Sequence, residues 1–293
     1  MKAVFATLLA VALLAAAAAA AFVRLGLYDI SATTSHTGIV YRLLETTMHH
    51  SVSRRAAGIQ APAALHEPQR VALGAACYRQ HCVQCHGAPG VAQDDIGKSL
   101  QPLPGPLVDA ARRWRPEEVY WITRHGIKMS GMPAWEARLS DNELWAVVAF
   151  VDRLAALSPA DYAGAMASSQ AFQCSSASPA CSGPPGCKPE PTADLQPLQM
   201  RDRDEQARLA LRQHACIACH RVRGVVGPDT HVGPPLEDFA RRQFLPGGLP
   251  NTHSNLVRWL REPQALHPGT AMPAMGVTDH HARLMADYLL KPE

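Results

Sequence analysis

Two copies of one short cysteine motif constrain this chain more than any other feature. Residues 82–86 read Cys-Val-Gln-Cys-His, and residues 216–220 read Cys-Ile-Ala-Cys-His. Two thiols on one short helical turn reach the two vinyl groups of one porphyrin, and the adjacent imidazole then lies under the iron. The motifs therefore predict two covalently bound haem c groups, attached through Cys82, Cys85, Cys216 and Cys219, with His86 and His220 as axial iron ligands.

Cys-x-x-Cys also occurs in zinc knuckles, thioredoxin-like redox pairs and structural disulfides. A zinc site would use both pairs together, but these pairs lie in different halves of the chain and each carries its own His. A thioredoxin-like pair would follow a strand, and no strand pattern precedes either motif. The residues therefore favour haem at both places.

A methionine followed by proline lies downstream of each motif. Gly131-Met132-Pro133 belongs to the first half and Ala271-Met272-Pro273 to the second. A thioether is a soft ligand that raises the potential of haem iron, and the proline keeps its loop extended. We expect Met132 and Met272 to be the sixth iron ligands. Met129, Met275 and His125 are competing ligands, and either Met-Pro pair can also be ordinary packing.

The two halves form a degenerate repeat of helical elements. A Gly-Pro turn, an Ala-Arg-Arg stretch and a Trp-bearing helix (117–124 and 255–261) follow each motif, before the Met-Pro loop. An amphipathic helix closes each half, opening at Ser140, with Glu143 at capping-box spacing, and at Thr278. The expected core faces of these helices are Leu144, Val147, Val148, Val151 and Leu154, and Leu284, Met285, Tyr288 and Leu289. The pattern predicts an all-α fold.

Each half resembles class I cytochrome c, and the second half is similar to cytochrome c domains fused to subunit two of haem-copper oxidases. Gly74 and Tyr78 resemble the first-helix contact of that family, whereas Ala207 and Leu211 depart from it. The resemblance implies two small helical domains in tandem, each around one haem. It also implies that Pro106 and Pro234 offer carbonyls to the proximal histidines.

Paired arginines follow the Gly-Pro turns of both halves. Arg112 and Arg113, and Arg241 and Arg242, together with Trp121 and Trp259, are candidates for contact with haem propionates, because guanidinium binds carboxylate in a bidentate fork. A solvated helix face explains the same residues equally well.

The N-terminus carries an uncharged apolar run, from Val4 to Val23. Its length matches a hydrocarbon layer of about 30 Å, although its Ala-rich end also suits a cleaved signal peptide. We favour a retained anchor, because the apolar character continues into Leu25, Leu27 and Tyr28. Residues 26–55 look like the membrane-proximal region of anchored bacterial cytochromes. The expected location is a single-pass bacterial inner-membrane protein with its haem domains in the periplasm.

These patterns divide the chain into five parts. They are an anchor (1–25), a membrane-proximal segment (26–67), a first cytochrome c domain (68–157), a Pro/Ser/Cys-rich linker (158–200) and a second cytochrome c domain (201–293). Cys174, Cys181 and Cys187 lie in the linker and should pair in an oxidising compartment. Either Cys77 joins them or one thiol stays free, and we favour Cys77 as a buried thiol.

The function that these residues favour is electron transfer. A net charge of +3 spread over both halves excludes a nucleic-acid-binding module. We expect a non-enzymatic carrier between redox protein donors and acceptors, such as an oxidase, a dehydrogenase or another respiratory complex. The alternatives are a dihaem enzyme such as a peroxidase, which needs an open iron site and an acid/base group, and a purely structural membrane tether without haem.

Overall fold

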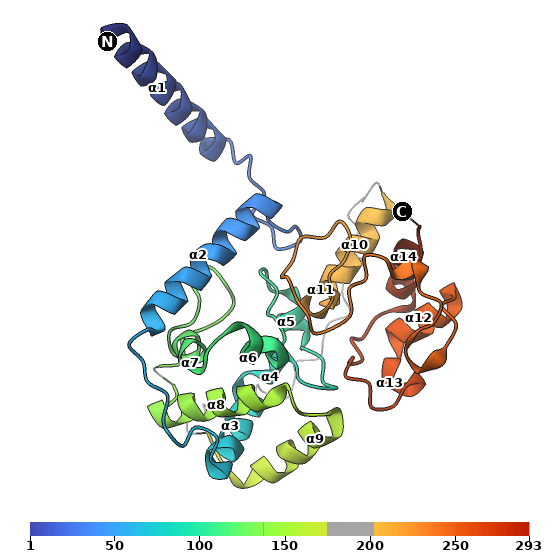
Figure 1. Ribbon diagram of the computed structural model, residues 1–293. Coiled ribbons are helices and arrows are strands. Elements are labelled where there is room, and N and C mark those ends of the chain that lie inside the picture. The colour runs from blue at the N-terminus through green and yellow to red at the C-terminus, as the bar shows by residue number, and fades with distance from the viewer. Residues whose placement is uncertain (137, 175–201, 293) are drawn as a thin grey trace, which may run out of the picture. The chain divides into compact units, whose positions relative to one another are not determined.

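The computed structural model describes residues 1–136, 138–174 and 202–292 (Figure 1). Its regular elements within these ranges are all helices, so the all-α expectation is confirmed for the described part of the chain. The α-helices are α1 (Lys2–Arg24), α2 (Gly38–Ala56), α3 (Pro68–His81), α4 (Val83–His86), α5 (Asp95–Ser99), α6 (Ala110–Arg113), α7 (Pro116–His125), α8 (Asp141–Leu154), α9 (Pro159–Ser168), α10 (Arg203–Gln213), α11 (Cys216–Cys219), α12 (His253–Arg261), α13 (Pro263–Leu266) and α14 (Asp279–Leu289). Short 3-10 turns are η1 (Leu107–Asp109), η2 (Ser169–Ala171), η3 (Phe239–Arg241) and η4 (Pro246–Gly248).

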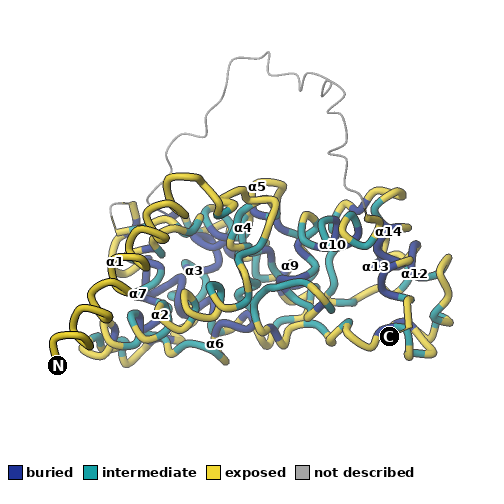
Figure 2. Tube along the Cα trace, turned by 90° about the horizontal axis from the view of Figure 1, so that it is seen from above, coloured by how far each residue is buried: buried dark blue, intermediate teal, exposed yellow. Residues whose placement is uncertain are grey.

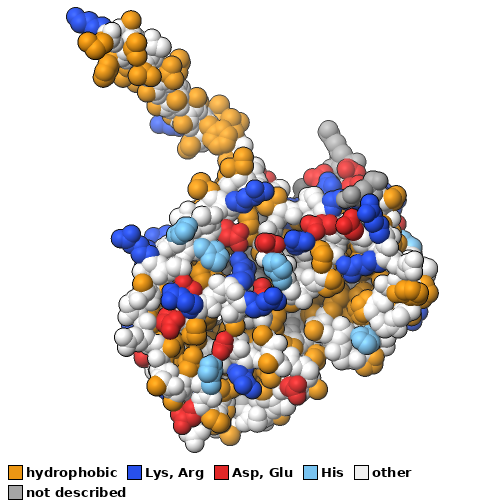
Figure 3. Space-filling model, viewed as in Figure 1, with side chains coloured by type: hydrophobic (Ala, Val, Ile, Leu, Met, Phe, Trp, Pro, Cys, Tyr) orange, Lys and Arg blue, Asp and Glu red, His pale blue; other side chains and the backbone are white. Residues whose placement is uncertain are grey.

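The chain divides into two compact units, residues 1–34 and residues 35–293. The first unit is dominated by α1, which has no buried residue and whose side chains are almost all hydrophobic (Figure 3). At about 1.5 Å per residue, this helix is long enough to cross the apolar part of a bilayer. Length and composition alone also fit a signal sequence near an N-terminus.

The larger unit contains two helical cores, which we call the first bundle (residues 38–174) and the second bundle (residues 202–292). In the first bundle α3 packs against α8, and in the second α10 and α12 pack against α14. Figure 2 shows buried positions along α3 and around α12–α14, whereas α1 is exposed. Each bundle therefore has its own core of apolar helix faces.

A glycine sets the distance between α3 and α8. A Cβ atom at Gly74 would lie 1.9 Å from the carbonyl oxygen of Ala146, so only glycine allows this helix crossing. One turn later, the fully buried Tyr78 contacts the ring of Phe150, and its hydroxyl donates to the Gly87 carbonyl at 2.6 Å. The hydrogen bond ties α3 to the residue that follows the first Cys-x-x-Cys-His motif.

The second bundle forms the corresponding crossing without glycine. Ala207 and Leu211 of α10 are both buried, and α10 packs against α14. The hydrogen bond that Tyr78 makes in the first bundle has a counterpart here in Tyr288 of α14, whose hydroxyl donates to the Arg223 carbonyl at 2.6 Å. A tyrosine hydroxyl thus donates to the chain just after the Cys-x-x-Cys-His motif in both bundles. The tyrosine belongs to the helix before the motif in the first bundle and to the last helix in the second.

The predicted caps and core faces of the last helices are confirmed. Ser140 and Glu143 form a capping box at the start of α8, and the Thr278 side chain accepts from the His281 N–H at the start of α14. All the residues expected on the apolar faces of α8 and α14 are buried.

Helix α2, in the segment before the first predicted domain, packs against that domain. Val52 and Ala56 of α2 are buried, and Ser53 donates to Glu118 of α7 at 2.6 Å. His49 also stacks on Trp114, with ring centroids 4.0 Å apart. The sequence pattern predicts one membrane-proximal segment over residues 26–67, but these contacts make α2 part of the first bundle.

The first bundle also continues past residue 157. Ser158 and Asp161 form a capping box that starts α9, and Tyr162 of this helix is buried against α3 and α8. The sequence pattern assigns residues 158–174 to the Pro/Ser/Cys-rich linker (158–200), whereas the structure makes them part of the first bundle. The local Ser-Pro-x-Asp signal, which starts a helix, outweighs that composition.

A third expectation, the state of Cys77, is also corrected by the structure. Cys77 forms a disulfide with Cys174, and both residues are buried in the first core. The sequence favours a buried thiol at Cys77, but the continuation of the core to residue 174 brings a partner cysteine against α3. Cys181 and Cys187 lie outside the described residues.

Candidate haem-binding sites

The first Cys-x-x-Cys-His motif folds into a single tight turn at the end of α3. The N–H groups of Cys85 and His86 both donate to the Cys82 carbonyl, at 3.1 and 2.9 Å. Gly87 follows with a φ of 61°, and a Cβ there would lie 2.8 Å from the Val91 carbonyl oxygen. The turn places both thiols and the imidazole on one short segment, which is what the spacing predicted.

The ring of His86 is held by a backbone carbonyl. Its Nδ1 lies 2.8 Å from the carbonyl oxygen of Gly105. The sequence predicts that the carbonyl of Pro106 accepts this hydrogen bond. In the structure the acceptor is the carbonyl of the preceding residue, Gly105. With Nδ1 occupied, Nε2 is the ring nitrogen left to ligate iron.

The second motif repeats this arrangement. Nδ1 of His220 lies 2.8 Å from the carbonyl oxygen of Pro234, the residue expected from the sequence. Gly233 donates its N–H to the Cys219 carbonyl at 2.8 Å, and a Cβ at this glycine would lie 2.3 Å from Cε1 of His220. A larger residue at position 233 would therefore displace the imidazole.

The two carbonyls occupy one equivalent position in the repeat. Gly105 precedes Pro106-Leu107, and Pro234 precedes Pro235-Leu236. An alignment of the two turns through their Gly-Pro pairs places Pro106 opposite Pro234, which is one residue past the observed acceptor in the first half. Matching the Pro-Leu pairs instead gives the correct carbonyl in both halves.

Burial sets the protonation of the thiols and the imidazoles. Desolvation raises the pKa of Cys82 and Cys216 to about 12 and that of Cys219 to about 11, and it also raises the pKa of Cys85. Burial lowers the pKa of His86 and His220, against the opposing effect of their carbonyl partners. The imidazoles are therefore neutral at pH 7, as an iron ligand requires.

The two Met-Pro loops share a local hydrogen bond. The N–H of Met132 donates to the Ser130 hydroxyl at 3.2 Å, and the N–H of Met272 donates to the Thr270 hydroxyl at 3.3 Å. Both methionines are half-buried. The sequence analysis missed Ser130 and Thr270, although the shared pattern Ser/Thr-x-Met-Pro is visible in both halves.

Two of the three residues that competed with these methionines have other environments. Met129 is 88% exposed, and His125 lies 3.5 Å from the Glu136 carboxylate through Nδ1. Met275, three residues after Met272, packs against the second core as Met272 itself does, so this contact does not distinguish the two methionines.

Two of the four arginines suggested for haem propionates have close protein partners. Arg113 pairs with Glu45 of α2 at 3.0 Å, and Arg242 donates to the Pro235 carbonyl at 2.6 Å. Trp259 is buried in the second core, and Trp121 lies against the ring of His125. The structure thus places Arg113 and Arg242 in contacts within the protein.

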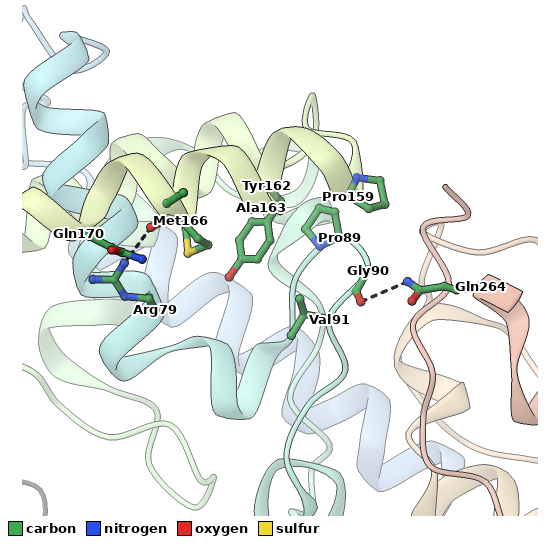
Figure 4. Close-up of a pocket in the computed structure, with 11 residues that line it drawn as sticks. Arg79, Pro89, Gly90, Val91, Pro159, Tyr162, Ala163, Met166, Gln170 and Gln264 are labelled. Atoms are coloured by element: carbon green, nitrogen blue, oxygen red, sulfur yellow. Dashed lines mark hydrogen bonds between the residues drawn. The ribbon is translucent and has the colours of Figure 1, made fainter. Parts of the chain in front are cut away.

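A cavity of about 560 Å³ lies beside α3 and α9 (Figure 4). Arg79 lines this cavity and donates to the Met166 carbonyl at 2.9 Å. Gln264 also lines it and donates to the Gly90 carbonyl at 3.2 Å. Neither Cys-x-x-Cys-His motif lines this cavity. It is therefore separate from the candidate haem sites.

Comparison with known proteins agrees with this chemistry. Residues 69–151 match the family model of cytochrome c oxidase, cbb3-type, subunit III. The chain is 39% identical over 69 residues to cytochrome c oxidase subunit 2 of Alkalihalophilus pseudofirmus, covering 24% of this chain and 19% of the relative. It is 32% identical over 84 residues to cytochrome c oxidase subunit 2 of a Bacillus species, strain PS3, covering 28% of this chain and 23% of the relative.

The similarity to both relatives is therefore confined to about a fifth of their length. No solved structure matches the chain. The chain contains a cytochrome c domain, which implies covalently bound haem c and a role in electron transfer linked to oxidase subunits.

Proposed function

We propose that this protein is a membrane-anchored dihaem cytochrome c that carries single electrons between respiratory partners. The repeated hydrogen bond from the motif histidine to a backbone carbonyl carries this proposal. It has the same length, 2.8 Å, at His86 and at His220, and it follows a Cys-x-x-Cys turn each time. A second haem site is the simplest reason for a chain to build this arrangement twice.

The residues fit the group at both sites. Cys82 and Cys85 would form the thioethers of the first haem, with His86 and Met132 as axial ligands. Cys216 and Cys219 would hold the second, with His220 and Met272 as ligands. Haem c supplies one-electron exchange between ferrous and ferric iron. The protein orients the imidazole through Gly105 or Pro234 and holds the methionine loop through Ser130 or Thr270.

The location and partners follow from three observations. Helix α1 has the length and composition of a single membrane span. The buried Cys77–Cys174 disulfide suits an oxidising compartment such as the periplasm. The matching proteins are named as subunits of cytochrome c oxidases. We therefore place the bundles in the periplasm of a bacterial inner membrane, exchanging electrons with an oxidase or a dehydrogenase.

Haem stoichiometry tests the proposal directly. The pyridine haemochrome of the denatured protein should give two haem c groups per chain. The double variants C82A/C85A and C216A/C219A should each retain one. Because the porphyrin would complete the core of a small bundle, each pair should also remove the cooperative thermal transition of its own bundle. A single haem in the unaltered protein, or none, would overturn the dihaem assignment.

The enzyme alternative predicts a different spectrum. A peroxidase needs an iron position that is open or easily displaced. Six-coordinate low-spin spectra with a weak methionine-to-iron band from both haems support a carrier. A high-spin ferric signal from either haem at neutral pH would favour catalysis instead.

A further inference from the structure

A histidine lies one or two residues before the Cys-x-x-Cys-His motif in each bundle. His81 precedes Cys82, and His214 lies two residues before Cys216. Neither residue belongs to the predicted haem-binding set. Both rings nevertheless lie where the same three elements meet. These are the Cys-x-x-Cys-His turn, which we call the haem turn, the loop around the Met-Pro pair, which we call the methionine loop, and the first turn of the last helix of the bundle.

In the first bundle, this junction is built by ring contact. The rings of His81 and Trp135 have centroids 4.8 Å apart and planes tilted by 48°. Trp135 lies three residues after Met132, and its N–H donates to the carbonyls of Thr123 and Arg124 at 3.2 and 3.1 Å. Glu143, the third residue of α8, is close enough to His81 to act on it electrostatically.

In the second bundle, the corresponding junction is built by hydrogen bonds. Nε2 of His214 lies 2.9 Å from Nδ1 of His281, which is the third residue of α14. Burial lowers the pKa of His214, and a hydrogen bond with the backbone of Met275, three residues after Met272, opposes this effect. Trp135 and Met275 therefore occupy equivalent positions in the two bundles, and so do Glu143 and His281. The contacts that these residues make with the histidine differ in their chemistry.

We propose that His81 and His214 are positioning residues that latch each methionine loop against its haem turn. The proposal rests on the dihaem function above. Each methionine lies in a loop between helices, where few main-chain hydrogen bonds hold it. Trp135 and Met275 pack on the cores of their own bundles, so a contact at this position fixes the end of the loop that follows the ligand. The histidine joins that end to the segment that carries the thioethers.

The second latch has one additional donor. Nζ of Lys98, in α5, lies 3.4 Å from the Met275 carbonyl, and the Lys98 side chain is only 13% exposed. Loss of the His214 ring therefore leaves one contact to this residue in place. We expect removal of His214 alone to have a smaller effect than removal of His81.

The test uses the full chain with both haems attached. His81→Leu removes the aromatic ring, and His81→Phe keeps a ring that can face Trp135. His214→Leu removes both hydrogen bonds, and His214→Gln keeps an amide that can donate to Met275. His280→Ala is the matched control, because His280 is exposed on the same turn of α14. In each variant, the haem of the other bundle serves as an internal reference.

The readouts are the ferric methionine-to-iron band, the potential of each haem and the affinity of ferric protein for added imidazole. In His81→Leu, imidazole should bind the first haem about tenfold more tightly. This corresponds to a loss of about 1.4 kcal/mol in the free energy that holds the methionine loop in its closed position. Its potential should fall, while the second haem is unchanged. His81→Phe and His214→Gln should retain near-native values. His214→Leu should affect only the second haem, and His214→Leu combined with Lys98→Met should affect it more.

Failure of this inference is distinct from failure of the proposed function. If the haemochrome gives fewer than two haems per chain, the dihaem function is wrong. If two haems are attached and the leucine variants leave both bands, both potentials and the imidazole affinity unchanged, the latch is wrong. Equal losses in the leucine variants and in their conservative partners would also refute it, because the specific contact would then not matter.

Discussion

At the scale of single residues, the candidate haem sites depend on atoms that the chain places within tenths of an ångström. The two histidine rings have the same hydrogen-bond length to a carbonyl, although one acceptor belongs to glycine and the other to proline. What differs is the space beside each ring. Gly233 has the His220 ring against it, whereas a Cβ at Gly105 would meet nothing within 4 Å.

This difference predicts that the same substitution affects the second site and leaves the first unchanged. Gly233→Ala would put a Cβ 2.3 Å from Cε1 of His220, so the ring must turn and its bond to Pro234 must weaken. We expect the second haem to lose its native ligand spectrum at lower guanidinium concentration, with a stability loss of about 1 kcal/mol or more. Gly105→Ala is the control and should leave the first haem unaffected. Equal effects at both sites would show that crowding of the ring is not the cause.

At the scale of elements, the crossing of α3 and α8 depends on close backbone contact. The nearest atoms to a Cβ at Gly74 are the carbonyl oxygen and carbon of Ala146, at 1.9 and 2.6 Å, and backbone atoms cannot move aside as a side chain can. The second bundle has Ala207 in its corresponding helix and therefore tolerates a methyl group there.

Gly74→Ala should consequently destabilise the first bundle, by about 1–3 kcal/mol or more, because overpacking shifts the helices. Chemical denaturation followed at the absorption of the first haem measures this loss. Gly164→Ala in α9 is the matched control. A Cβ at Gly164 meets nothing within 4 Å, and alanine favours a helix by up to about 1 kcal/mol. A neutral Gly74→Ala would mean that α3 and α8 do not cross this closely.

At the scale of the whole molecule, the first bundle is larger than the region that matches the family model. Helix α2 packs before that region and α9 packs after it, and the Cys77–Cys174 disulfide joins α3 to the end of the added segment. The two cysteines are 97 residues apart in sequence, so the bond closes a loop that contains the first haem motif.

Removal of this disulfide should destabilise the first bundle selectively. A crosslink over a loop of this size typically contributes about 2–5 kcal/mol. In C77A/C174A, unfolding at the first haem should shift by an amount in this range, with the second haem unchanged. Alkylation of the denatured protein without reduction should leave Cys77 and Cys174 unlabelled. Labelling of both residues in the unaltered protein would contradict the bond.

Much of the fold and of the candidate site could be predicted from local sequence. The Cys-x-x-Cys-His turns, the caps at Ser140 and Thr278 and the buried faces of α8 and α14 depend on residues a few positions apart. Hydrogen bonds and helical periodicity over such distances follow from residue type and spacing alone. The chemistry of two thiols beside an imidazole is local in the same way.

Contacts between distant segments required the tertiary structure. The disulfide partner of Cys77, the burial of α2 and α9, and the approach of His81 to Trp135 all join residues far apart in the chain. Sequence patterns state which side chains prefer burial but not which buried surfaces meet, because that choice depends on how the helices pack together.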